Sequence, residues 1–331
     1  MNTRRTFRPG VAFAIGSALT FGMSGPFAKS LMEAGWTPTA AVTARLAGGA
    51  LVTALFATIV NPRWAREAVR HAKTVVLYGL IPIAGAQLCY YNAVSHMSVG
   101  MALLLEYLAP VLVVGWIWAT TRRRPSTLTL TGTALALAGT FVVLDVFSGT
   151  HFNAAGVTWA LAAAACAACY FLLSDRVAAD GSGLKSVTLA AGGLVVGAVS
   201  VALLGLTGAM PLAFTTRGTV VAGHPVSTIV PVVVLGVVST AIAYLLGISG
   251  VARLRPSYAA LLGLGEVLCA VLAAWVLVGE AVTAAQAVGG VVVLMGLALA
   301  GRNDRPSEQL VVAAAWPDAT AAEDLTLSGR Q

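Results

Sequence analysis

The chain has 331 residues, of which 58% are hydrophobic and only 10% are charged, and its formal net charge is +7. Because soluble domains carry about 25% charged residues, this composition excludes a soluble globular protein and predicts an all-α polytopic membrane protein. The positive charge predicts no nucleic-acid partner, since the basic residues fall in short loops between apolar segments.

Ten apolar segments follow one another along the chain, each about 18–25 residues long. This is the length that one helix needs to cross a bilayer core about 30 Å thick. We therefore predict ten transmembrane helices. They cover residues 10–31, 38–60, 74–94, 98–119, 127–147, 155–174, 187–210, 228–251, 257–278 and 283–301.

The loops predict the orientation of these helices. Nearly all of the 20 Lys and Arg residues fall on one side, and the loops of the other side contain only Arg217. Because Lys and Arg concentrate in cytoplasmic loops, we place both termini in the cytoplasm and the protein in the cytoplasmic (inner or plasma) membrane. Residues 1–9 are then a cytoplasmic tail, and the polar residues 302–331 are expected to form a disordered cytoplasmic tail.

The two halves of the chain match without a gap when one is shifted by 157 residues. This register predicts a duplication, with one five-helix repeat at 10–147 and a second at 155–301. Since five is an odd number of crossings, the second repeat must be inverted in the membrane, an architecture typical of alternating-access transporters. The matched pairs include Gly79 with Gly236, Ala102 with Ala259, and Gly139 with Gly296.

The last quarter of the chain reads L-G-E-V-L-C-A-V-L-A-A-W-V-L-V-G-E and then Q-A-V-G-G-V-V-V-L-M-G. It resembles the L-E-P-x-x-A-x-L-x-A-W-x-x-x-G-E…Q-x-x-G-x-x-x-I-x-x-G pattern of the EamA-type exporters of the drug/metabolite transporter superfamily. Val267 replaces the usual proline, whereas the first half keeps Pro110 but has Ala109 in place of the acid. The first helix, including Lys29, is also similar to the opening helix of that family.

The resemblance implies ten helices in two inverted five-helix repeats around a cavity formed by helices 1, 3, 4, 6, 8 and 9. It further implies a secondary active transporter that exports amino acids or similar small metabolites. A multidrug or other small-solute exporter stays open, because one fold serves many solutes. The expected partners are a small-molecule solute and the lipid bilayer, with the chain a monomer or homodimer.

Glu106 is the first candidate for contact with the solute. It lies near the middle of a predicted span, where an ionisable group costs roughly 2.5–3.5 kcal/mol unless it faces water or a partner. It can hold an ammonium group or exchange protons, and the alternative is a protonated or paired structural acid. Glu266 lies one helical turn from the corresponding position of the second repeat, so we expect both acids to face one cavity.

Other polar and aromatic side chains within the spans are candidates for the cavity wall. For each of them a structural role stays open: hydrogen bonding between helices, core packing, or a cation that extends to the membrane interface. These candidates are Gln87, Tyr90, Tyr91, Trp159, Tyr170, Tyr244, Arg45 and Lys29.

Prolines and glycines mark special backbone positions. Pro82 and Pro110 lack a backbone N–H within their spans, so we expect helix kinks there. Glycines permit close contact between helices, and a packing role is predicted for Gly132, Gly139, Gly289, Gly290 and Gly296.

The sequence predicts no enzyme and no metal or other cofactor. It contains neither a P-loop nor an H-E-x-x-H pair, and all four cysteines fall within predicted spans, where packing is their expected role. An intramembrane enzyme and a non-transporting membrane scaffold are the alternatives from other functional classes.

Overall fold

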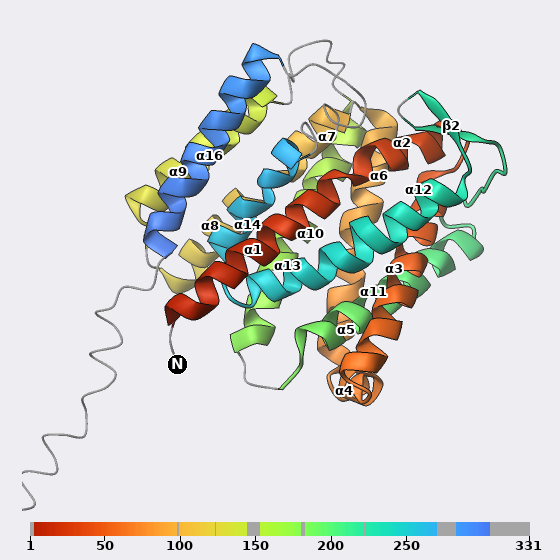
Figure 1. The fold of residues 1–331 in the computed structure, drawn as a ribbon, viewed down its shortest axis with the longest axis horizontal. Helices are drawn as coiled ribbons and strands as arrows, with labels where there is room; N and C mark the ends of the chain where they lie inside the picture. Colours follow the sequence, from red (N-terminus) through yellow and green to blue (C-terminus); the bar gives the residue numbers. More distant parts are fainter. Residues whose placement is uncertain are drawn as a thin grey trace, which may run out of the picture.

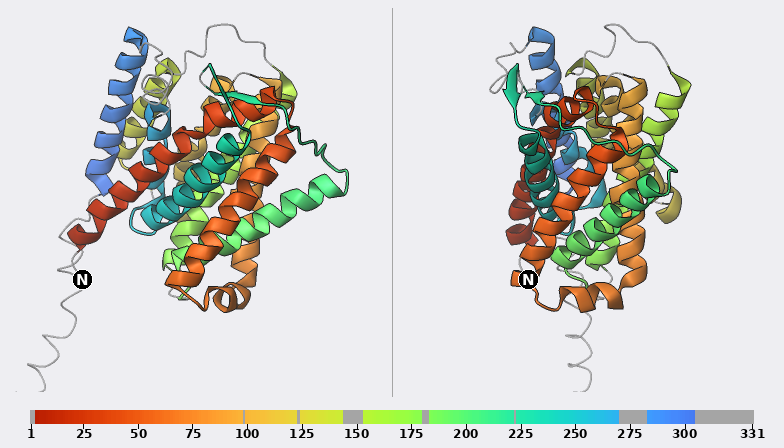
Figure 2. Two further views of the ribbon diagram at one scale, coloured as in Figure 1. Left: turned by 45° about the vertical axis from the view of Figure 1, so that its right-hand side comes forward. Right: turned by 90° about the vertical axis from the view of Figure 1, so that its right-hand side faces the viewer.

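The protein is a bundle of helices with one small β-hairpin, β1–β2 (Figures 1 and 2). Among the described residues, seven helices are long and apolar enough to cross a membrane, and three further apolar helices are shorter. The first helix begins and the last one ends on the same side of the bundle (Figures 1 and 2). The computed structural model describes residues 3–97, 99–122, 124–143, 153–179, 183–221, 223–269 and 283–304. The predicted tail beyond 304 lies outside these residues.

The predicted span 38–60 coincides with α3, and its start follows from local chemistry. The Thr37 hydroxyl accepts a hydrogen bond from the Ala40 N–H at 3.3 Å. Pro38 occupies the first turn, where its missing N–H is not needed. The first half comprises α1 (Thr3–Gly22), α2 (Ser24–Glu33), α3 (Pro38–Val60), α4 (Trp64–Arg70), α5 (Ala72–Tyr78), η1 (Gly79–Gly85), α6 (Ala86–His96), α7 (Val99–Glu106), α8 (Ala109–Thr121) and α9 (Thr127–Val143).

Two spans contain a π-helical segment, and these segments overlap under the 157-residue shift. They are η1, which contains Pro82, and η2 in the second half. π-Helical turns are rare and frequently occur at functional sites, so their recurrence supports the predicted duplication. The second half comprises α10 (Ala154–Ala179), α11 (Ser186–Leu206), β1 (Thr219–Val221), β2 (His224–Val226), α12 (Ile229–Val233), η2 (Val234–Ile242), α13 (Ala243–Val251), α14 (Pro256–Gly263) and α16 (Ala284–Asp304).

Within the predicted span 98–119, a two-residue turn at 107–108 separates two helices next to Pro110, where a kink was expected. α7 ends at Glu106 and α8 begins at Ala109, with Pro110 in the first turn of α8. Proline is tolerated there because its missing N–H has no partner in a first turn. A turn at Leu264 interrupts the corresponding span of the second half. Both breaks thus fall beside the two acidic candidates.

The helices assemble into two bundles that each combine helices from both halves. In the first bundle, α10 packs against α6, α7 and α8; in the second bundle, α1 packs against α13 and α14. Two further pairs, α3 with α11 and α9 with α16, flank them, and α9 and α16 lie side by side at one edge (Figures 1 and 2). The two bundles enclose the candidate site.

Glycines allow α9 and α16 to pack closely, in line with the packing role predicted for them. A Cβ at Gly139 would lie 2.6 Å from the Gly289 carbonyl oxygen and 2.6 Å from the Val293 nitrogen. A Cβ at Gly296 would lie 2.6 Å from the Gly132 carbonyl oxygen. Because these neighbours are backbone atoms, they cannot move aside as a flexible side chain can.

Gly139→Ala is therefore expected to push α9 and α16 apart and to destabilise the protein by about 1–3 kcal/mol. The measurement is the unfolding temperature of the full chain in detergent, which should fall by about 2–8 °C. Gly115→Ala is the matched control, since nothing lies within 4 Å of a Cβ there. Equal unfolding temperatures for the two variants would contradict the close contact.

Glu67 in α4 ties the first half of the chain to the start of α11. Its carboxylate accepts hydrogen bonds from the Lys185 backbone N–H at 2.6 Å and from the Asn61 side-chain amide at 2.7 Å. Partial burial by itself raises the pKa of Glu67, but the hydrogen bonds hold this pKa below its ordinary value. The ionised carboxylate is therefore the form that stabilises this contact.

Glu67→Gln is expected to destabilise the protein near neutral pH but not in acid. Since the folded-state pKa is depressed, the stabilisation is present above the unfolded-state pKa and is lost as the pH falls through the folded-state value. We expect a loss of about 1 kcal/mol around pH 7 that shrinks below about pH 5, measured by thermal unfolding. Glu33→Gln, which alters an exposed carboxylate, is the control. A loss that stays constant with pH would contradict this account.

Candidate functional site

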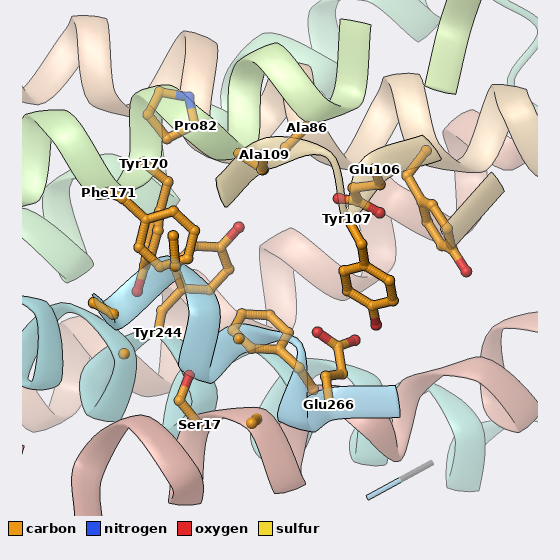
Figure 3. Close-up of a pocket in the computed structure, with 18 of the residues that line it drawn as sticks. Ser17, Pro82, Ala86, Glu106, Tyr107, Ala109, Tyr170, Phe171, Tyr244 and Glu266 are labelled. Carbon is orange, nitrogen blue, oxygen red and sulfur yellow. The ribbon is translucent and has the colours of Figure 1, made fainter. Parts of the chain in front are cut away.

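A cavity of about 160 Å³ lies between the two bundles, and many of the predicted candidates line it (Figure 3). Its wall combines two acids, one arginine, one glutamine and several aromatic rings. The sequence candidates on this wall are Arg45, Pro82, Gln87, Tyr90, Glu106, Pro110, Tyr170, Tyr244 and Glu266.

Three other candidates lie outside this cavity. Lys29 is exposed and pairs with Glu33 at 3.7 Å, one turn further along α2. Tyr91 is buried behind the wall, where its hydroxyl contacts Arg45. Trp159 packs against a cluster of alanines from three helices. The structure therefore places Lys29 and Trp159 away from any direct contact with a solute in this cavity.

The two acids face each other across the cavity. Glu106 projects from the end of α7 and Glu266 from the segment after α14; both line the cavity, and in the view of Figure 3 the ring of Tyr107 lies between their carboxylates. Neither forms an ion pair or a hydrogen bond with another side chain in the described part of the chain. Their negative charge is thus left for a solute, a proton or water.

Arg45 lies on the same wall and is only 2% exposed. Its Nε donates to the Thr240 hydroxyl at 2.9 Å, and its Nη2 donates to the Ser239 carbonyl oxygen at 2.8 Å. Its Nη1 donates to the Tyr91 hydroxyl at 3.4 Å. These acceptors are neutral, and no described carboxylate lies within ion-pair distance. The hydrogen bonds fix the guanidinium but leave its charge without a counter-ion.

The wall also carries buried polar atoms without hydrogen-bond partners. Among the described residues these include Gln87 Oε1, the Tyr107 hydroxyl and the Tyr170 hydroxyl. Since a buried polar atom without a partner costs about 1–3 kcal/mol, such a cluster indicates a site that receives a polar ligand or water.

Several residues of the wall were missed by the sequence reasoning. Tyr107 follows Glu106, and a continuous helix would point the two side chains in different directions; the break after α7 brings both onto the wall. Phe21, Ser17 and Phe171 also line the cavity. They look like ordinary core residues in the sequence, so no local signal distinguishes them.

The described residues contain no group of three or more His, Cys, Asp and Glu side chains that could hold a metal ion. The four cysteines are free thiols. The cavity therefore offers carboxylates, a guanidinium and aromatic rings as its binding groups.

Comparison with known proteins supports this description of the chain. Residues 8–145 and 154–302 each match the EamA-like transporter family. An inner membrane transporter of Salmonella typhimurium (strain LT2), YicL, named as uncharacterized, is 24% identical over 242 residues, covering 71% of this chain and 75% of that protein. A crystal structure superposes with a TM-score of 0.70 at 20% identity, covering 91% of this chain and all of the other, and it shows a shared fold.

The two family matches together span most of the sequence and correspond to its two halves. The apolar helices and the cavity between the two bundles are consistent with a membrane transporter. The chain belongs to the EamA-like transporter family, and it is an integral membrane transporter.

Proposed function

We propose that this transporter is a secondary active exporter that moves amino acids or similar small metabolites by alternating access and exchanges them for protons. The observation that carries this proposal is the cavity that holds Glu106, Glu266 and Arg45 with no ion pair among them. Buried charges of both signs without counter-ions suit a solute that carries both an ammonium and a carboxylate group.

The packing supports a rocking movement of the two bundles around the cavity. Each bundle combines helices from both halves, and the contacts of α10 with α6 resemble those of α1 with α13. Under the 157-residue shift the π-helical segments and the helix breaks also correspond. These features favour ten helices in two inverted repeats, with both termini in the cytoplasm.

The size of the cavity favours a small metabolite over a multidrug substrate. Pockets for drug-sized ligands measure about 300–1,000 Å³, whereas this cavity measures about 160 Å³. The unpartnered hydroxyl and amide groups on its wall also suit a polar solute.

Proton exchange follows from the same carboxylates. With no described counter-ion at hand, Glu106 and Glu266 can hold a proton in the empty state and release it when an ammonium group binds. A proton gradient across the membrane would then drive the cargo outward.

The test is a flux assay with the full chain in proteoliposomes, using a panel of amino acids and of larger organic cations, with and without an imposed pH gradient. We expect saturable movement of amino acids that a pH gradient accelerates. Movement of the larger cations alone would favour the multidrug alternative. Absence of movement for the whole panel, with the protein folded, would contradict transport of these solutes.

A further inference from the structure

We propose that the cargo is an α-amino acid with a cationic side chain, of the lysine, ornithine or arginine type. This inference deepens the proposed function and rests on it. It concerns the match between the charges on the cavity wall and those of the cargo.

The charge balance of the wall is the first step. Once both carboxylates have released their protons to let the cargo bind, Glu106 and Glu266 carry two negative charges and Arg45 carries one positive charge, so the cavity then has a formal charge of −1. A neutral amino acid leaves that charge uncompensated, and a diamine leaves Arg45 without an anion. An amino acid with a cationic side chain has a net charge of +1 and offers one counter-ion to each of the three side chains.

Arg45 is built to receive the carboxylate. A guanidinium has five N–H donors, and the three hydrogen bonds to Thr240, Ser239 and Tyr91 leave two of them uncommitted in a side chain that lines the cavity. Those three contacts also hold the group in one orientation. A fixed guanidinium on a cavity wall is suited to a carboxylate, which it can bind through two parallel hydrogen bonds.

The two acids then divide between the two cationic groups of the cargo. In an α-amino acid the ammonium group is next to the carboxylate, so the acid that interacts more strongly with Arg45 receives it. We assign this place to Glu266, which lines the same cavity as Arg45. Glu106 lies across the cavity and is left for the side-chain cation (Figure 3).

The remaining wall supports the same assignment. Gln87 Oε1 is a buried acceptor that receives no hydrogen bond. An ammonium or guanidinium group supplies several N–H donors, whereas an aliphatic side chain supplies none. The aromatic rings of Tyr90 and Phe171 offer apolar surface for the methylene groups of such a cargo.

The test compares lysine, ornithine, leucine and cadaverine as ligands of the purified full chain, by thermal stabilisation in detergent and by flux in proteoliposomes. We expect lysine or ornithine to bind at least about tenfold more tightly than leucine, and cadaverine to bind most weakly. In Glu106→Gln the advantage of lysine over leucine should disappear. Glu33→Gln, exposed and outside the cavity, is the matched control and should keep the wild-type ranking.

Equal binding of leucine and lysine by the wild type would overturn the inference while leaving an amino-acid exporter in place. Cadaverine binding as tightly as lysine would overturn it too, because the carboxylate would then contribute nothing. If Glu106→Gln still binds lysine more tightly than leucine, Glu106 is not the residue that binds the side-chain cation of the cargo. If Glu106→Gln does not fold, the wild-type ranking decides by itself. Absence of binding and flux for every amino acid would instead reject the proposed function.

Discussion

Arg45→Leu is expected to abolish transport and to lower the free energy of unfolding by about 3–5 kcal/mol. The guanidinium joins α3 to η2 and α6 through its bonds to Thr240, Ser239 and Tyr91. Leucine would leave these buried acceptors without donors and would remove the cation from the wall. Thermal unfolding in detergent and proteoliposome flux are the two measurements.

Arg45→Lys separates the two roles of the side chain. Lysine keeps the positive charge, but its ammonium group cannot reproduce the planar guanidinium that donates hydrogen bonds to both η2 and α6. We expect this variant to fold, with a stability between those of the wild type and Arg45→Leu, and to bind amino acids at least about tenfold more weakly. Wild-type flux in Arg45→Leu would show that the cation plays no part in cargo binding.

Glu266→Gln is expected to reduce the transport of lysine and leucine alike by about 100-fold or more. In the proposed site Glu266 holds the α-ammonium group, which every amino acid carries. Removing one partner of a buried charge pair costs about 2–5 kcal/mol, and about 3 kcal/mol corresponds to a factor of more than 100 in affinity. Glutamine preserves the shape of the side chain, so the fold should be retained.

The measurement is initial flux against cargo concentration, with unfolding temperature as the check on folding. Glu106→Gln is the informative comparison, because it should reduce the transport of lysine more than that of leucine. Glu33→Gln reports the effect of losing a carboxylate at an exposed position. If Glu266→Gln loses the transport of lysine but keeps that of leucine, Glu266 rather than Glu106 binds the side-chain cation.

The sequence predicted the apolar helices well because hydrophobicity over a span is a strong local signal. The start of α3 follows from Thr37 and Pro38, and the packing role of Gly139 and Gly296 follows from the absence of a side chain within an apolar helix. The mid-span positions of Glu106 and Glu266 likewise made them stand out, since an acid in an apolar segment is rare.

Features that depend on contacts across the fold could not be predicted in the same way. The hydrogen-bond partners of Arg45 could not be predicted, because its acceptors in η2 lie about 195 residues away along the chain. Tyr107 was not among the candidates, because the turn after α7 that accompanies its position on the wall is not visible in the sequence. Lys29 resembles a family residue, yet its side chain pairs with Glu33 on the surface. In each case the tertiary arrangement decides the role.

Each of the two bundles contains helices from both halves of the chain, so the chain cannot be divided at its middle into two complete bundles. α10 completes the group formed by α6, α7 and α8, while α1 completes the group formed by α13 and α14. A gene split between the two halves would therefore encode fragments that each lack a helix the other supplies. Neither fragment could enclose the cargo alone, and activity would return only on co-expression, through reciprocal exchange of one helix in each direction.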